Sequence, residues 1–388
     1  MNAYFCIVNQ VYFSMISRTI SQKITSLFGS RKAILIMGAR QVGKSTLLKQ
    51  LLKERNDVLW LNGDDWDVQE LFSTITSTRL RAIIGDNRFV VVDEAQRIPE
   101  IGLRLKLITD QIPDVQLIAT GSSSFELSSK VSESLTGRKR EFIMCPLTFE
   151  EMVNHTQFLD EVRMIPHRMV YGYYPEVVTT PGDERMLLKE LTNSYLYKDI
   201  LSLDGINKPE KLVRLLKALA LQIGSQVSYN EIGMLVGLDP KTVERYVDIL
   251  EKSFVIFRLG TFSRNMRNEL KSSRKIYFWD LGVRNAVIGN LAPVDNRTDV
   301  GELWENFVIA ERMKRNVYTE SFAQSYFWRN RQQQEVDYLE EVDGRLHAYE
   351  FKWNVRKSKV KCPVSFQSNY PEATYKVITP ENVEEFLL

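Results

Sequence analysis

The segment that decides the fold is Ala33-Ile34-Leu35-Ile36-Met37-Gly38-Ala39-Arg40-Gln41-Val42-Gly43-Lys44-Ser45-Thr46. Its apolar first part predicts a buried β-strand, and residues 46–53 predict a helix. Between them, two glycines let the backbone turn so that successive N–H groups point at phosphate oxygens. This spacing is that of a phosphate-binding loop (P-loop). We expect nucleotide contacts from Gly38, Arg40, Gln41, Val42, Gly43, Lys44, Ser45 and Thr46.

The P-loop predicts ATP as a ligand and Mg²⁺ as its cofactor. Lys44 is placed to reach the β- and γ-phosphates, and the hydroxyl of Ser45 is placed to bind Mg²⁺. A second apolar strand, Phe89-Val90-Val91-Val92, ends in Asp93-Glu94. In an ATPase, an acid at that place supports Mg²⁺ and its neighbour activates water. We therefore assign Asp93 to the metal and Glu94 to catalysis.

Two further segments offer catalytic residues. The strand expected at 115–119 runs into Thr120-Gly121-Ser122-Ser123-Ser124, where Ser122 is placed to sense the γ-phosphate or to orient water. A plain Ser-rich turn is the alternative. In the basic run 138–140, Arg138 is a candidate arginine finger, acting within the chain or on a neighbouring subunit. A simple surface charge is the alternative there.

Composition sets the wider limits. The chain has 388 residues, 44% hydrophobic and 26% charged, so two or three globular domains are expected. A net charge of +2 means that any nucleic-acid surface must be local. The three cysteines are far apart, which indicates a reduced, cytoplasmic setting without zinc. Residues 1–15 are apolar but too short to span a bilayer, so no membrane association is expected. Residues 1–14 are either an extra strand or a non-native start.

The order of these motifs resembles a family of bacterial and archaeal AAA-type ATPases. That family carries an AAA domain, a winged helix and a C-terminal domain with a restriction-endonuclease-like core. The similarity covers about residues 16–388 and rests on the P-loop and the following segments: Val91-Val92-Asp93-Glu94-Ala95-Gln96, Ala119-Thr120-Gly121-Ser122-Ser123-Ser124, Thr136-Gly137-Arg138, Pro146-Leu147-Thr148-Phe149-Glu150-Glu151, Gly172-Tyr173-Tyr174-Pro175-Glu176-Val177 and Tyr197-Lys198-Asp199-Ile200.

The middle of the chain predicts a winged helix at 208–265. Helices are expected at 211–222, 229–236 and 240–253, followed by a strand at 254–259 that would begin the wing. Between residues 206 and 274 there are twelve Lys or Arg and seven Asp or Glu, which suits phosphate contacts. A protein-binding lid is the alternative. The candidate DNA-binding residues are Lys241, Thr242, Arg245, Arg258, Arg264 and Arg267.

The C-terminal part predicts a hairpin that carries charged side chains. Asp337 lies on one expected strand, and Glu350 and Lys352 lie on one face of the next. Two carboxylates and an ammonium suit metal-assisted cleavage of phosphodiesters. Glu305, on the helix expected at 301–315, matches the supporting acid of the restriction-endonuclease-like signature. Val336 departs from the proline of the strict motif, and an inactive fold that uses these charges structurally is the alternative.

The sequence therefore predicts an α/β chain with four parts: an AAA-type P-loop core at 16–165, a helical linker or lid at 166–207, a winged helix at 208–265, and an endonuclease-like α/β domain at 266–388. The function expected is Mg²⁺-dependent ATP hydrolysis coupled to DNA binding or remodelling. Two alternatives stay open. One is a nucleotide-gated switch that binds protein partners, and the other is a nuclease licensed by ATP. A homo-oligomer, such as a ring, is a further expectation.

Overall fold

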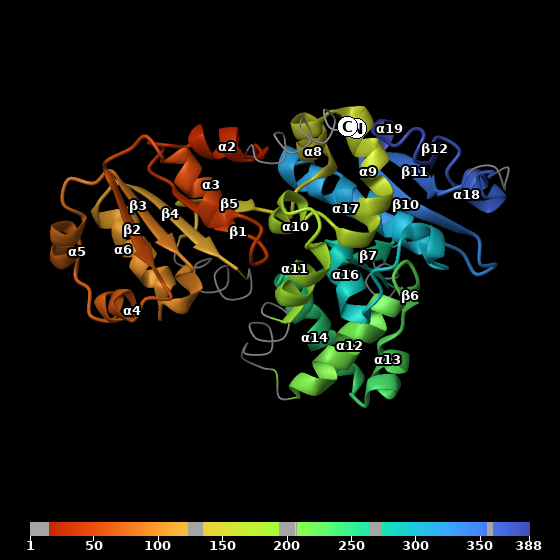
Figure 1. The fold of residues 1–388 in the computed structure, drawn as a ribbon, viewed down its shortest axis with the longest axis horizontal. Helices are drawn as coiled ribbons and strands as arrows, with labels where there is room; N and C mark the ends of the chain where they lie inside the picture. The colour runs from red at the N-terminus through yellow and green to blue at the C-terminus, as the bar shows by residue number, and fades with distance from the viewer. Residues whose placement is uncertain (1–14, 123–134, 194–205, 207, 264–273, 355–359) are drawn as a thin grey trace. The chain divides into compact units, whose positions relative to one another are not determined.

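The computed structural model describes residues 15–122, 135–193, 206, 208–263, 274–354 and 360–388 (Figure 1). Its contacts divide the chain into two compact units. The first comprises residues 17–146 and 252–254, and the second comprises the rest. Within the described residues, no helix is both long and apolar enough to cross a membrane. The segment 1–14, whose origin the sequence left open, lies outside the described residues.

The first unit is a parallel five-stranded sheet flanked by helices. Its strands follow the order β2-β3-β4-β1-β5, and every pair is parallel. The elements are α2 (Ser21–Thr25), β1 (Ala33–Met37), α3 (Lys44–Leu51), β2 (Val58–Asn62), α4 (Trp66–Ser73), α5 (Ser77–Ile84), β3 (Phe89–Asp93), η1 (Ala95–Arg97), α6 (Ile101–Gln111), β4 (Gln116–Gly121) and β5 (Lys139–Ile143).

The central strands of this sheet are apolar because helices cover both of its faces. All residues of β1 and β4 are buried, as are the first four of β3. The edge strands β2 and β5 are partly exposed and carry polar residues. The strands expected around 33–37, 89–92 and 115–119 are confirmed.

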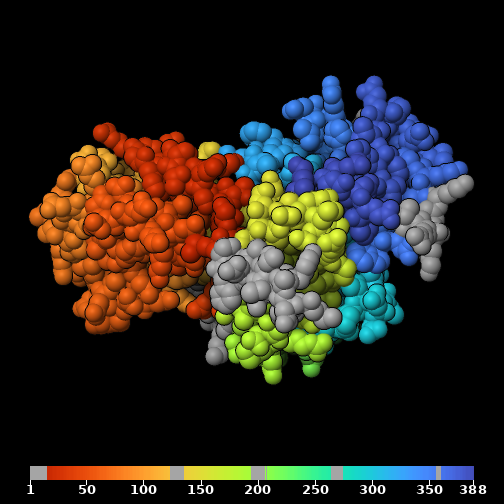
Figure 2. Space-filling view, turned by 45° about the horizontal axis from the view of Figure 1, so that its top comes forward, coloured from red at the N-terminus to blue at the C-terminus, as the bar shows by residue number. Residues whose placement is uncertain are grey.

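The second unit is built on a mixed seven-stranded sheet of order β12-β11-β10-β9-β7-β8-β6. In the space-filling view, its yellow surface adjoins the blue surface of the C-terminal part (Figure 2). Its helices are α8 (Phe149–Thr156), α9 (Phe158–Tyr171), α10 (Pro175–Thr179), α11 (Glu184–Leu191), α12 (Pro209–Leu221), α13 (Tyr229–Val236), α14 (Pro240–Lys252), α16 (Leu281–Ile288), η4 (Val294–Asn296), α17 (Val300–Thr319), α18 (Val364–Asn369) and α19 (Glu384–Leu387). Its strands are β6 (Gln226–Val227), β7 (Ile256–Thr261), β8 (Arg274–Phe278), β9 (Gln324–Arg329), β10 (Glu335–Val342), β11 (Arg345–Phe351) and β12 (Thr374–Ile378).

The helices expected at 211–222, 229–236 and 240–253 are confirmed as α12, α13 and α14. The strands near them have a wider role than a wing. β7 pairs antiparallel with β8 and, on its other side, parallel with β9. Ile256, Phe257 and Leu259 of β7 are buried, which fits a strand inside a sheet. Strands from 208–265 and from 266–388 therefore join one sheet.

Candidate functional site

The P-loop adopts a left-handed turn between β1 and α3. Gln41 has φ +63° and Gly43 has φ +96°, and α3 begins directly at Lys44. The Lys44 ammonium donates to the carbonyl oxygens of Gly38 (2.8 Å) and Ala39 (2.9 Å). Val42 is buried, whereas Gln41 and Thr46 are exposed. The lysine is thus held inside the loop, beside the N-terminus of a helix, where anions are favoured.

The strand order explains which residues meet the P-loop. β4 lies between β1 and β3, so the residues at its carboxyl end stand between the P-loop and the end of β3. Ile36 of β1 is in register with Thr120. The hydroxyl of Ser45 donates to Asp93 Oδ2 (2.6 Å), and the hydroxyl of Thr120 donates to Asp93 Oδ1. Two hydroxyls and a carboxylate, all oxygen donors of the kind Mg²⁺ prefers, therefore converge here.

Glu94 follows Asp93 in a left-handed conformation, with φ +48°. Its N–H donates to Thr120 Oγ1 (3.1 Å). The buried side chain of Gln96 donates to Glu94 Oε2 (2.6 Å) and to Ser122 Oγ (2.9 Å). A side chain at Gly63 would come within 2.3 Å of the Glu94 carbonyl oxygen, so this close backbone approach requires glycine. Glu94 and Ser122, expected at one site, are thus linked through Gln96.

Burial changes the acidity of the P-loop lysine. It lowers the pKa of Lys44 to about 8, while the charges of Glu94 and Asp93 oppose that shift and Arg40 adds to it. Lys44 is therefore close to Arg40, Asp93 and Glu94, all of which the sequence assigned to the same site. Near neutral pH the ammonium is mostly protonated and carries the charge that phosphate binding requires.

Sequence reasoning missed three residues of this site: Arg18, Gln96 and Thr120. Arg18 is buried before β1, and its guanidinium donates to the carbonyl oxygens of Val42 (2.7 Å) and Cys145 (2.6 Å). It thereby ties the P-loop to the segment after β5. Arg18 lies 24 residues before Val42, and no local sequence pattern predicts a contact over that separation. Thr120 and Gln96 lay within quoted motifs, but their roles depend on the strand order.

Arg138 is not brought to the P-loop of its own chain. It directly precedes β5, its carbonyl oxygen accepts from Ala33 N–H, and Ala33 begins β1. The P-loop follows the other end of β1, about 13 Å away for a five-residue strand. The Arg138 guanidinium is paired with Asp110 (2.8 Å). A finger role within the same chain does not fit this position, so only action on a neighbouring copy stays a prediction.

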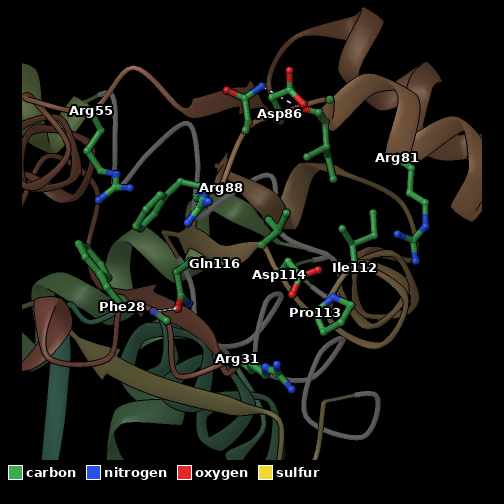
Figure 3. Close-up of a pocket in the computed structure, with 16 residues that line it drawn as sticks. Phe28, Arg31, Arg55, Arg81, Asp86, Arg88, Ile112, Pro113, Asp114 and Gln116 are labelled. Atoms are coloured by element: carbon green, nitrogen blue, oxygen red, sulfur yellow. Dashed lines mark hydrogen bonds between the residues drawn. The ribbon is translucent and has the colours of Figure 1, made fainter.

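A cavity of about 790 Å³ lies at that same amino edge of the sheet (Figure 3). Arg31, Arg55, Arg81 and Arg88 line it together with Asp86 and Asp114. Arg55 is already paired with Asp57 (2.8 Å). The cavity is thus separate from the P-loop, which lies at the carboxyl edge of the sheet.

Three segments of the chain match known families. Residues 30–153 match a family described as an AAA domain. Residues 162–293 and 300–386 each match a domain of unknown function (DUF8612 and DUF4143). Residues 30–153 form an AAA-type ATPase domain. This AAA domain contains the P-loop, Asp93, Glu94 and Ser122, so nucleotide binding at this site agrees with the family match.

Relatives extend the similarity beyond the AAA domain. An uncharacterized protein of Mycobacterium tuberculosis is 25% identical over 324 residues, which cover 82% of this chain and 70% of the relative. An uncharacterized protein of Methanocaldococcus jannaschii is 22% identical over 346 residues, which cover 83% of this chain and 75% of the relative. Among solved structures, a Walker-type ATPase of Pyrococcus abyssi overlaps with a TM-score of 0.49 at 16% identity, covering 70% of this chain and 96% of the other.

The residues expected at DNA are used in different ways. Arg264 and Arg267 lie outside the described residues. Arg258 is paired with Asp248 (2.7 Å) and with Glu251. The N–H and hydroxyl of Thr242 donate to Asp239 (3.0 and 2.6 Å). Lys241 and Arg245 are exposed. Arg258 and Thr242 therefore stabilise α14 and its contact with β7, which leaves Lys241 and Arg245 facing solvent.

The C-terminal hairpin brings its expected residues together. Asp337 on β10 accepts from Phe351 N–H (2.9 Å), and Lys352 donates to Glu350 Oε1 (2.7 Å). Glu305 on α17 joins them with Glu335, and we call Glu305, Glu335, Asp337 and Glu350 the carboxylate cluster. Burial raises the pKa of Glu305 to about 7, with the Asp337 charge adding to that rise and Lys275 opposing it. Burial also raises the pKa of Asp337 and of Glu350.

Two observations test whether a divalent metal fits this cluster. Among the described residues, no three His, Cys, Asp or Glu side chains are arranged to hold a metal ion. In addition, a buried lysine that sequence reasoning missed, Lys275 of β8, contacts two members of the cluster. The donor set is therefore already bound to a cation of the chain itself, and a metal does not fit it as it stands.

Proposed function

We propose that this protein binds ATP with Mg²⁺ and hydrolyses it. The observation that supports this function best is the convergence of Ser45 and Thr120 on Asp93, with Glu94 as the next residue. This arrangement places metal-binding oxygens beside a P-loop and a second carboxylate next to them. Such a pairing separates two roles, metal support and activation of water, that one carboxylate could not fill at once.

Each side chain has a distinct task in this proposal. Lys44 binds phosphate oxygens through its ammonium. The Ser45 hydroxyl and the Asp93 carboxylate would hold Mg²⁺, whose chemistry is to neutralise charge on the phosphates. Glu94 accepts a proton from the attacking water. Gln96, which also donates to Ser122, fixes the direction of the Glu94 carboxylate.

Glu94→Gln tests the catalytic assignment. We expect ATP affinity within about twofold of the parent and turnover reduced about 100-fold or more, because an amide is not a base at neutral pH. Glu100→Gln is the matched control, since Glu100 shares the left-handed conformation (φ +50°) but is exposed and pairs with Arg104. Equal turnover in the parent and in Glu94→Gln would remove Glu94 as the base.

A nucleotide-gated switch is the second candidate. The hydrogen bond that Gln96 donates to Glu94 favours this function, because a carboxylate held by a neighbouring side chain can change its position when nucleotide binds. A switch would bind ATP tightly while the parent protein turned over as slowly as Glu94→Gln. Steady-state phosphate release, measured beside ATP binding, separates the two functions.

Coupling to DNA is a further part of the proposal. Its support is the exposed pair Lys241 and Arg245 on the first turns of α14, a helix that follows the shorter α13. We expect DNA to raise ATP turnover, and Lys241→Ala/Arg245→Ala to abolish that rise without changing basal turnover. DNA affinity should fall steeply with salt. Solution mass with ATP, with and without DNA, tests the expected oligomer.

A further inference from the structure

Lys275 of β8 contacts two members of the carboxylate cluster, Glu305 of α17 and Glu335 of β10. Its side chain is 1% exposed. The ammonium lies 3.0 Å from Glu305 Oε1 and 2.5 Å from Glu335 Oε1, and 5.4 Å from the centre of the Phe327 ring. Two carboxylates and an aromatic face thus surround it. These are the surroundings that stabilise a desolvated cation.

Each member of the carboxylate cluster also has a partner other than Lys275. The Tyr277 hydroxyl donates to Glu305 Oε1 (2.6 Å). Asp337 accepts from a backbone N–H and Glu350 accepts from Lys352, as described above. Arg329 lies 3.4 Å from Glu335 Oε2. Lys275, Lys352 and Arg329 together bring three positive charges to four carboxylates.

The backbone keeps Lys275 in this place. β8 is paired on both sides, with Lys275 opposite Leu259 of β7 and opposite Gln226 of β6. On α17, the residue after Glu305 fixes the helix to the same strand, because Asn306 accepts from Phe278 N–H (2.9 Å) and donates to Phe278 O (2.9 Å). Swinging the ammonium out would leave buried carboxylates without their cation, which is strongly unfavourable.

We propose that Lys275 is the resident cation of the carboxylate cluster and occupies the place that a divalent metal would need. A divalent ion needs several oxygen ligands at 2.0–2.6 Å, and it cannot share Glu305 and Glu335 with an ammonium at hydrogen-bonding distance. In the parent protein the carboxylate cluster is a structural part of the second unit that is paired with cations of the chain itself, and it takes up no Mg²⁺ or Mn²⁺. The second unit therefore does not cleave DNA by a metal-assisted route, although Asp337, Glu350 and Lys352 are arranged as expected.

The inference predicts a gain of metal binding when the ammonium is removed. Lys275→Ala leaves space and uncompensated carboxylates. We expect saturating Mn²⁺ to raise its melting temperature by about 5 °C more than that of the parent protein. Lys275→Met is the matched control, because it also removes the charge but fills most of the space, and we expect no such rise. Parent and variants should bind ATP equally, since Lys275 lies outside the AAA domain.

Two results would overturn the inference. One is a Mn²⁺-dependent rise in the parent as large as that in Lys275→Ala, and the other is no rise in Lys275→Ala. If Lys275→Ala does not fold, Glu305→Gln/Glu350→Gln decides the question in calorimetric Mn²⁺ titrations of the full chain. We expect this variant and the parent to bind the same number of Mn²⁺ ions. Loss of a bound ion in the variant, or Mn²⁺-dependent DNA cleavage by the parent that the variant lacks, would contradict the proposal.

Discussion

The glycine that opens the P-loop offers a direct test of how the AAA domain is packed. An ideal Cβ built on Gly38 would lie 2.1 Å from the backbone oxygen of Met144, whereas real Cβ contacts essentially never fall below 3.0 Å. Gly38→Ala therefore requires a displacement of about 0.9 Å. The atom in the way is backbone, so no side-chain rotation relieves the clash. The same residue, Met144, donates its N–H to Met37 O (2.6 Å), and the displacement weakens that bond.

The expected cost follows from these two effects. Overpacking against backbone and a weakened buried hydrogen bond together lower the free energy of unfolding by about 2–4 kcal/mol. Urea unfolding of the full chain measures this, and a fluorescent ATP analogue measures the accompanying loss of affinity. Gly301→Ala is the control, because nothing lies within 4 Å of its Cβ position at the start of α17. It should stabilise by about 0.4–1 kcal/mol.

The outcome that would refute this reasoning is specific. A neutral surface substitution changes the free energy of unfolding by about 0.5 kcal/mol or less. If Gly38→Ala changes the free energy of unfolding by no more than that and leaves the ATP affinity unchanged, the close approach of the P-loop to the segment after β5 is wrong.

Three further predictions concern named side chains. Because burial lowers the pKa of Lys44 to about 8 and bound phosphate favours its charged form, ATP binding takes up a proton above that pH. The affinity for ATP should fall up to about fivefold between pH 8 and pH 9, whereas a Lys44→Arg variant should show no such dependence. Gln96→Leu should lower kcat about tenfold at unchanged ATP affinity, because Glu94 loses an orienting hydrogen bond; an increase in kcat would contradict this. In the second unit, Arg168→Met leaves Glu161 buried without its ion pair (2.9 Å) and should cost about 3–5 kcal/mol by urea unfolding, with Glu161→Leu/Arg168→Met recovering part of that loss.

The nucleotide site was largely predictable because its motifs are local. The strand, turn and helix around the P-loop follow from apolar periodicity and from two glycines within six residues. The Asp93-Glu94 pair follows directly from the end of an apolar strand. The helices α12, α13 and α14 were equally readable, since amphipathic spacing and the Gly237 and Pro240 boundaries are local signals.

Predictions that depended on the partners of individual side chains were less accurate. Arg258 and Thr242 have the residue types and positions of DNA contacts, yet both are engaged within the protein. Arg138 has the residue type of an arginine finger, but it lies at the edge of the sheet opposite the P-loop. In each case the residue type was informative and the direction of the side chain was not, because direction depends on segments that are distant in sequence.

The sequence by itself determined the P-loop, the acidic end of β3, and the hairpin that carries Asp337 and Glu350, because each is fixed by spacing within a few residues. Only the tertiary structure decided that β4 places Thr120 on Asp93, that Arg18 holds the P-loop, and that Lys275 enters the carboxylate cluster. Those contacts arise from the order of strands in two sheets, and strand order is set by long-range packing that no local pattern records.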